Sequence, residues 1–150
     1  MLYELMEQTD VTITCLIRAS SVEEGNARIV ANLRRYGLLR EAHKGRYQAI
    51  CGDLIEPFLG LGESGFKALA SDIDTIVHSA AWVNFVYPYD HLKATNVDST
   101  ETILELAIAA KPKPIAVHFI STLGVIMSTG YAKDEFVKET DPLLYAEEVV

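Results

Sequence analysis

The sequence predicts an α/β fold of the Rossmann type, in which helices cover a doubly wound parallel sheet. Two observations lead to this prediction. Short apolar or β-branched runs alternate with helical patterns along the 150 residues, and such alternation favours parallel strands joined by right-handed crossovers. A chain of this length also suits one domain with a single core, so we expect residues 1–150 to form one domain.

The first half of the chain contains the pattern of helix, strand and helix. Residues 1–8 place apolar side chains on one helical face without a capping residue, which indicates the end of a helix. Val11–Ile17 is a β-branched run that suits a strand buried on both faces. Ser21 and Glu24 have the spacing of a capping box, which predicts a helix that ends near Gly37.

The second half repeats the alternation. Tyr47–Cys51 is predicted as a strand, and Ser64 is a candidate cap for the helix that follows it. Ile73–Val77 is predicted as the third strand, Val97–Ala110 as an amphipathic helix, and Ile115–Ile120 as the fourth strand.

The composition argues against several classes of protein. The formal net charge is −8 and the basic residues are dispersed, so nucleic acid is not an expected partner. No run approaches the roughly 20 apolar residues of a membrane span. Cys15 and Cys51 lie within apolar runs, which suits small core residues in a reducing cytoplasm. His78 and His118 lack metal-site spacing and are interpreted as strand residues, so no metal is expected.

Residues that directly follow the strands are the first candidates for a site, because a doubly wound sheet binds its ligand at the carboxyl ends of its strands. Arg18 follows the first strand, and its planar guanidinium can bind a ribose 2′-phosphate, which favours NADP(H) over NAD(H). Arg28 is a candidate second phosphate contact. The alternative for both arginines is a solvated surface position.

The other strand ends carry small or hydrogen-bonding residues. Asp53 can accept from an adenine amino group while Leu54 forms an apolar wall, or the Gly-Asp pair is only a turn. Thr122 can donate to a developing oxyanion, although hydroxyls near strand ends are common. The small side chains after the third strand leave room for a flat ligand or for a packed helix, and they are Ser79, Ala80 and Ala81.

These positions together resemble the thioester reductase domains of nonribosomal peptide and polyketide synthetases and the reductase domains of carboxylic acid reductases. The most specific stretch is IVHSAAWVNFVYPYDHLKATNV, residues 76–97, and CLIRAS, GDLIEPFLGL and HFISTLGV support it. The likeness spans nearly the whole chain. Fatty acyl-CoA reductases share much of this pattern.

The resemblance implies an extended short-chain dehydrogenase/reductase that uses NADPH on an acyl thioester held by a phosphopantetheinyl carrier protein. It implies that Asn96 helps to hold the catalytic site together and that residues 83–87 approach the substrate or its pantetheine arm. The remaining implied roles are a 2′-phosphate contact at Arg18, adenine contacts at Asp53 and Leu54, contacts near the ribose and nicotinamide at Ala80 and Ala81, and a catalytic hydroxyl at Thr122.

Two departures from the family pattern shape the prediction. No glycine-rich phosphate-binding turn precedes Val11, and no Tyr-x-x-x-Lys pair follows the last strand, since Tyr131 and Lys133 have the wrong spacing. We therefore expect an incomplete sheet that lacks its first, central strand, and a 150-residue chain that is inactive alone. Unpaired edges on the strands at Val11 and Ile73 predict poor solubility or self-association.

The leading hypothesis is an NADPH-dependent reductase segment of a larger assembly-line enzyme, whose product is an aldehyde or an alcohol. A rival hypothesis is a non-catalytic remnant or nucleotide-binding module. A third, a sugar-nucleotide epimerase or dehydratase, explains the cofactor residues but not the HSAAWVNFVYPY stretch.

Overall fold

The strands form two parallel pairs. The computed structural model describes residues 1–109 and 112–122. Strand β1 (Ile13–Ile17) pairs in parallel with β2 (Tyr47–Cys51), and β3 (Thr75–His78) pairs in parallel with β4 (Ala116–Phe119). Within the described residues no hydrogen-bonded ladder joins β1 to β3. The α/β class and the parallel pairing are as predicted, and β1 and β3 each have one edge without a strand partner in this part of the chain.

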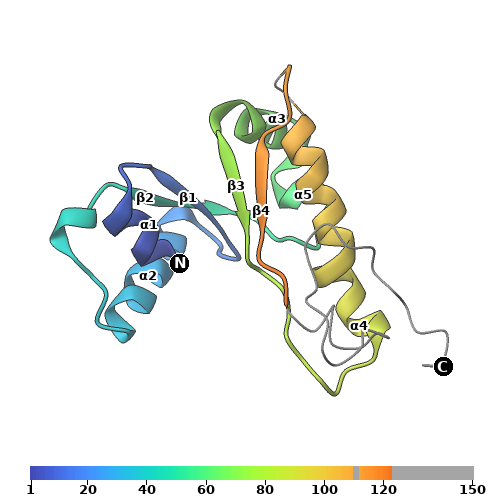
Figure 1. Ribbon diagram of the computed structural model, residues 1–150, viewed down its shortest axis with the longest axis horizontal. Coiled ribbons are helices and arrows are strands. Elements are labelled where there is room, and N and C mark those ends of the chain that lie inside the picture. Colours follow the sequence, from blue (N-terminus) through green and yellow to red (C-terminus); the bar gives the residue numbers. More distant parts are fainter. Residues whose placement is uncertain (110–111, 123–150) are drawn as a thin grey trace, which may run out of the picture.

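Helices flank each pair of strands, as Figure 1 shows, with α1 and α2 beside β1 and β2 and the later helices beside β3 and β4. Their bounds are α1 Leu2–Gln8, α2 Val22–Arg35, α3 Gly62–Asp72, α4 Tyr89–Lys93 and α5 Ser99–Ile108, with a π-helical segment at Ala94–Asp98 between the last two and short 3₁₀ turns at Glu41–His43 and Pro57–Gly60.

The buried apolar residues form two clusters, where the sequence predicted a single core. One lies between α1, α2 and the first strand pair and contains Met6, Ile29, Leu33 and Ala49. The other lies between α3, α5 and the second strand pair and contains Leu59, Phe66, Ala70, Ile76, Ile103, Leu106, Ala107 and Ile115. The division follows from the topology, because no strand in the described residues bridges β1 and β3.

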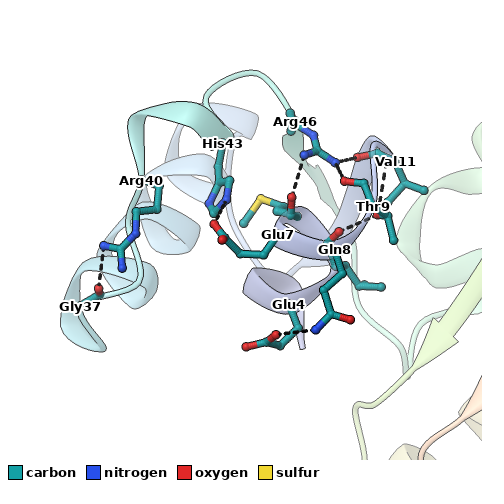
Figure 2. Close-up of polar contacts among 11 residues, drawn as sticks. Glu4, Glu7, Gln8, Thr9, Val11, Gly37, Arg40, His43 and Arg46 are labelled. Carbon is teal, nitrogen blue, oxygen red and sulfur yellow. Dashed lines mark hydrogen bonds and ion pairs between the residues drawn. The ribbon is translucent and has the colours of Figure 1, made fainter.

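Helix α1 is fastened to the first strand pair by two side chains that precede β2 (Figure 2). The Arg46 guanidinium donates to the carbonyl oxygens of Met6 and Val11 at 2.8 and 3.0 Å, and also to that of Thr9. Carbonyls at a helix C-terminus have no partner within the helix, so the guanidinium supplies the missing donors. The buried His43 pairs through Nε2 with Glu7 Oε1 at 2.6 Å.

Two helix starts differ from the prediction. Ser64 does not cap α3, which begins at Gly62, because a turn with positive φ at Phe58 and Leu59 buries the Leu59 side chain and sets where the helix begins. The last helical region begins at Tyr89 rather than at Val97. The π-helical segment shifts the side-chain register there, so the apolar period of α5 does not extend back to Tyr89.

The predicted capping box of α2 is present in modified form. The Ser21 hydroxyl accepts from the backbone N–H of Glu24 at 3.2 Å. The Glu24 carboxylate accepts in return from the N–H and hydroxyl of Ser20, one residue before the position expected. These bonds, with the Ser20 hydroxyl bond as the larger cause, lower the pKa of Glu24. The start of α2 after Arg18 is therefore fixed locally.

Candidate cofactor and substrate site

The ends of β1 and β2 bring two predicted cofactor residues together. Because the two strands are parallel neighbours, Arg18 after β1 lies next to Asp53 after β2, and Arg18 Nε is 3.8 Å from Asp53 Oδ2. The second carboxylate oxygen of Asp53 accepts from the N–H of Ile55 at 3.2 Å. The Arg18 side chain is 76% exposed, so its remaining N–H groups face solvent and are accessible to an anion.

The turn that carries Asp53 depends on a glycine. Gly52 N–H donates to the Ile17 carbonyl at 3.1 Å, and Asp53 N–H donates to the Leu59 carbonyl at 2.9 Å. A Cβ on Gly52 would lie 2.2 Å from that same Leu59 oxygen, so no larger residue fits without moving the turn. Leu54 is half-buried and packs against the cluster of β3 and β4. This contact gives Leu54 a packing role beside its predicted place at the adenine.

Arg28 lies close to Arg18 but is held by protein groups. One of its guanidinium nitrogens donates to the Arg18 carbonyl, and the other donates to Glu24 Oε1 at 2.8 Å. Arg28 thus braces the end of β1 against α2. Its predicted contact with a phosphate remains a prediction.

A cavity lies mainly between α1, α2 and β1. Its volume is about 750 Å³, and its wall includes Arg28 from α2, Cys15 and Ile17 from β1, and Ser79 after β3. Burial raises the pKa of the Cys15 thiol, which favours the neutral thiol in this wall. Two of the predicted cofactor residues, Arg28 and Ser79, therefore line one cavity.

The predicted residues on the second strand pair also lie at one edge of the sheet, where β3 and β4 end. The pairing of β3 with β4 continues for one residue, because Ile120 N–H donates to the His78 carbonyl at 2.9 Å. Ser79 therefore leaves β3 where Ser121 and Thr122 leave β4. Ala80, Ala81 and Thr122 are exposed, so this edge is accessible to a ligand. Tyr131 and Lys133 lie outside the described residues.

Asn96 holds the chain that follows β3. Its Oδ1 accepts from Trp82 N–H at 2.7 Å, and its Nδ2 donates to the Trp82 carbonyl at 3.0 Å. Asn96 lies in the π-helical segment, and such segments are frequent at functional sites. The amide therefore fixes the backbone of Trp82 by both of its hydrogen-bonding groups, a geometry in keeping with the organising role that the resemblance implies.

Asn84 entered the sequence-based prediction only as part of the range 83–87. Its Oδ1 accepts from the N–H groups of Val86 and Tyr87, each at 2.9 Å. Asn is a frequent turn residue because its side chain hydrogen-bonds the backbone two residues on, and Pro88 ends this loop. That signal was available in the sequence.

The site offers carboxylates, amides, hydroxyls and guanidinium groups. Within residues 1–109 and 112–122 there is no group of three or more His, Cys, Asp or Glu side chains suited to a metal ion. Burial lowers the pKa of His78, which favours a neutral imidazole packed against Phe119 with ring centroids 5.3 Å apart. No helix in this described part is long and apolar enough to cross a membrane.

The parallel strand pairs with flanking helices define a Rossmann-like α/β fold. The chain belongs to the NAD-binding family described as male sterility protein, whose model matches residues 1–148.

Relatives of known identity include assembly-line synthetases and their reductase domains. The chain is 46% identical over 141 residues to a linear gramicidin synthase component of Brevibacillus parabrevis. It matches the crystal structure of the terminal R domain of the myxalamid PKS-NRPS pathway at 39% identity with a TM-score of 0.82. It also matches a thiolation-reductase di-domain of an archaeal nonribosomal peptide synthetase at 27% identity with a TM-score of 0.69.

The matched region is a small part of each relative. The alignment covers 94% of this chain but 3% of the gramicidin synthase component. It covers 95% of this chain and 35% of the myxalamid R domain structure, and 85% of this chain and 33% of the archaeal di-domain.

Proposed function

We propose that these residues belong to an NADPH-dependent reductase domain that reduces a carrier-bound acyl thioester to an aldehyde or an alcohol. The observation that carries the proposal is the exposed Arg18 guanidinium next to Asp53 at the ends of adjacent parallel strands. This is where a Rossmann-like sheet binds the adenosine half of a dinucleotide. Family membership and the likeness to R domains support the same assignment.

In this proposal, residues at the ends of β1 and β2 bind the adenosine half of the cofactor, and residues after β3 and β4 lie at the reacting groups. Bound NADPH would supply a hydride for the thioester carbonyl carbon, and cleavage of the C–S bond would release the aldehyde and leave the thiol on the carrier protein. Arg18 binds the ribose 2′-phosphate through N–H groups that face solvent, and Asp53 accepts from the adenine amino group. Ala80 and Ala81 leave room for the cofactor beside the end of β3. Thr122 donates to the carbonyl oxygen as negative charge develops on it, which stabilises the transition state.

A carrier protein is the proposed partner, since the acyl group must arrive as a thioester. The similarity to a thiolation-reductase di-domain supports this partner class. Residues 83–87 would contact the acyl chain or pantetheine arm, because the side chains of Val83, Phe85 and Val86 are exposed and apolar. The cytoplasmic location and self-association through the edges of β1 and β3 stay predictions.

The first test uses the protein at its native length, isolated from its own cells. We expect oxidation of NADPH that depends on an acyl thioester bound to a carrier protein, and release of an aldehyde or alcohol. NADH should be a much poorer donor. Oxidation of neither cofactor, together with no protection by NADPH in thermal melting, would overturn the proposal.

A non-catalytic nucleotide-binding module is the second candidate. The observation in its favour is that residues 120–150, which follow β4, contain no Tyr-x-x-x-Lys pair. Such a module would be stabilised by NADPH in melting experiments without consuming it, while a remnant that has lost binding would not be stabilised at all.

A further inference from the structure

The loop between β3 and α4 presents apolar side chains to solvent. Val83, Phe85 and Val86 are 73%, 97% and 88% exposed. None of the three belongs to either buried cluster. Exposed apolar side chains gathered in one short loop indicate an interaction site more often than scattered surface residues do, so the loop is suited to an apolar ligand.

The backbone of this loop is nevertheless held in one shape. Asn84 lies at its centre, and its Oδ1 accepts from the N–H groups of Val86 and Tyr87. The Tyr87 ring packs edge-on against Trp82 with centroids 5.4 Å apart, and it contacts His91 of α4 at 5.7 Å. The hydrogen bonds to Asn84 Oδ1 and the contact between the Trp82 and Tyr87 rings thus stabilise the turn that exposes Phe85 and Val86.

We infer that Asn84 is a positioning residue that orders this loop for binding the acyl thioester, an inference that rests on the proposed function. The carbonyl oxygen of Asn84 is engaged by two backbone donors, and the side chain is half-buried. Asn84 therefore acts on the substrate through the placement of Phe85 and Val86. Both bonds lie within the loop, so their loss leaves the Arg18 and Asp53 pair untouched.

Substitutions at Asn84 separate this role from a merely structural one. Asn84→Ala removes the acceptor, whereas Asn84→Asp keeps an oxygen in the same place. Asn26→Ala is a matched control, because Asn26 Oδ1 accepts from the N–H of Ala49 in β2 at 2.8 Å, far along the chain from the loop. The control removes the same type of bond from a different place.

Tryptophan fluorescence measures how exposed and how mobile the loop is. The sequence contains a single tryptophan, Trp82, and it lies in the loop against Tyr87. In the protein at native length, with any tryptophan other than Trp82 replaced by phenylalanine, we expect Asn84→Ala to increase acrylamide quenching of Trp82 and lower its fluorescence anisotropy. Asn84→Asp and Asn26→Ala should match the wild type in both measurements. Unchanged quenching in Asn84→Ala, or increased quenching in Asn84→Asp, would overturn the inference.

Kinetics at native length test the consequence for binding. Each hydrogen bond of this type shifts an equilibrium by about two- to tenfold, so we expect Asn84→Ala to raise KM for the carrier-bound thioester about tenfold. KM for NADPH should stay unchanged, and Asn84→Asp should restore the thioester KM. Equal changes in both KM values, or none, would overturn the inference. A wild type inactive with every thioester would instead overturn the proposed function, while the fluorescence result still decides the role of Asn84.

Discussion

The turn after β2 makes a sharp prediction, because Gly52 has no space for a side chain. In Gly52→Ala the new Cβ would lie 2.2 Å from the carbonyl oxygen of Leu59 and 2.7 Å from a methyl carbon of Leu16. The leucine side chain can move, but the Leu59 oxygen belongs to the backbone and accepts from Asp53 N–H. We expect the segment that carries Asp53 to be pushed away from β2.

Two effects lower the free energy of unfolding in Gly52→Ala. Overpacking of a well-packed site destabilises a protein by about 1–3 kcal/mol. Loss of the hydrogen bond between Asp53 N–H and the Leu59 carbonyl adds about 1 kcal/mol. The free energy of unfolding should therefore fall by about 2–4 kcal/mol. Because Asp53 moves with the turn, NADPH affinity should fall as well.

Urea denaturation followed by far-ultraviolet circular dichroism measures the effect. Gly65→Ala is the matched control, because a Cβ there would meet only the Leu61 side chain, at 3.2 Å, within α3. Alanine in a helix interior gains about 1 kcal/mol over glycine, and this gain offsets the close contact with the Leu61 Cβ at 3.2 Å, so the control should unfold near the wild-type midpoint. A Gly52→Ala midpoint equal to that of Gly65→Ala would refute the steric argument.

Three further substitutions test other parts of the structure. Arg18→Ala should reduce the preference for NADPH over NADH by about 10- to 100-fold, since a charged hydrogen-bonded contact contributes about 1.5–3 kcal/mol; equal loss with both cofactors would contradict a 2′-phosphate contact. Burial lowers the pKa of His78, so the unfolded chain binds a proton first as the pH falls below about 6.5. The contribution of neutral His78 to the free energy of unfolding is therefore present above that pH and is lost as the pH falls to the folded-state pKa. Between about pH 7.5 and 5.5, the melting temperature should fall less steeply in His78→Gln than in the wild type. Arg46→Met removes the donors that hold the end of α1, so amide exchange should accelerate in α1 and stay unchanged in β3.

The strands were predicted well because their signal is local. Tyr47–Cys51 was predicted and observed with the same bounds. The first strand was predicted two residues too long, since Val11 uses its carbonyl to accept from Arg46 rather than to pair with β2. That bond joins positions 35 residues apart, so no local pattern contains it.

The errors and omissions arise where tertiary contacts decide. Ser64 had the chemistry of a cap, but burial of Leu59 sets the start of α3 two residues earlier. The meeting of Arg18 with Asp53 followed from parallel pairing and was predictable once the strands were assigned. The two bonds at Asn84 were not predicted. The tendency of Asn to bind the backbone two residues on points to the Val86 N–H, whereas the bond from the Tyr87 N–H depends on how the loop folds.

The candidate site is divided between the two strand pairs, and the division has a consequence for binding. Arg18, Arg28 and Asp53 belong to the pair β1 and β2, whereas the chain after β3 and Thr122 belong to the other pair. Each pair packs on its own buried cluster, and Leu16 of β1 also packs against the cluster of the other pair. A dinucleotide that contacts Arg18 at one end and the chain after β3 at the other must bind both at once. Because such a ligand stabilises whatever it binds, it would couple two units that no strand ladder joins within the described residues.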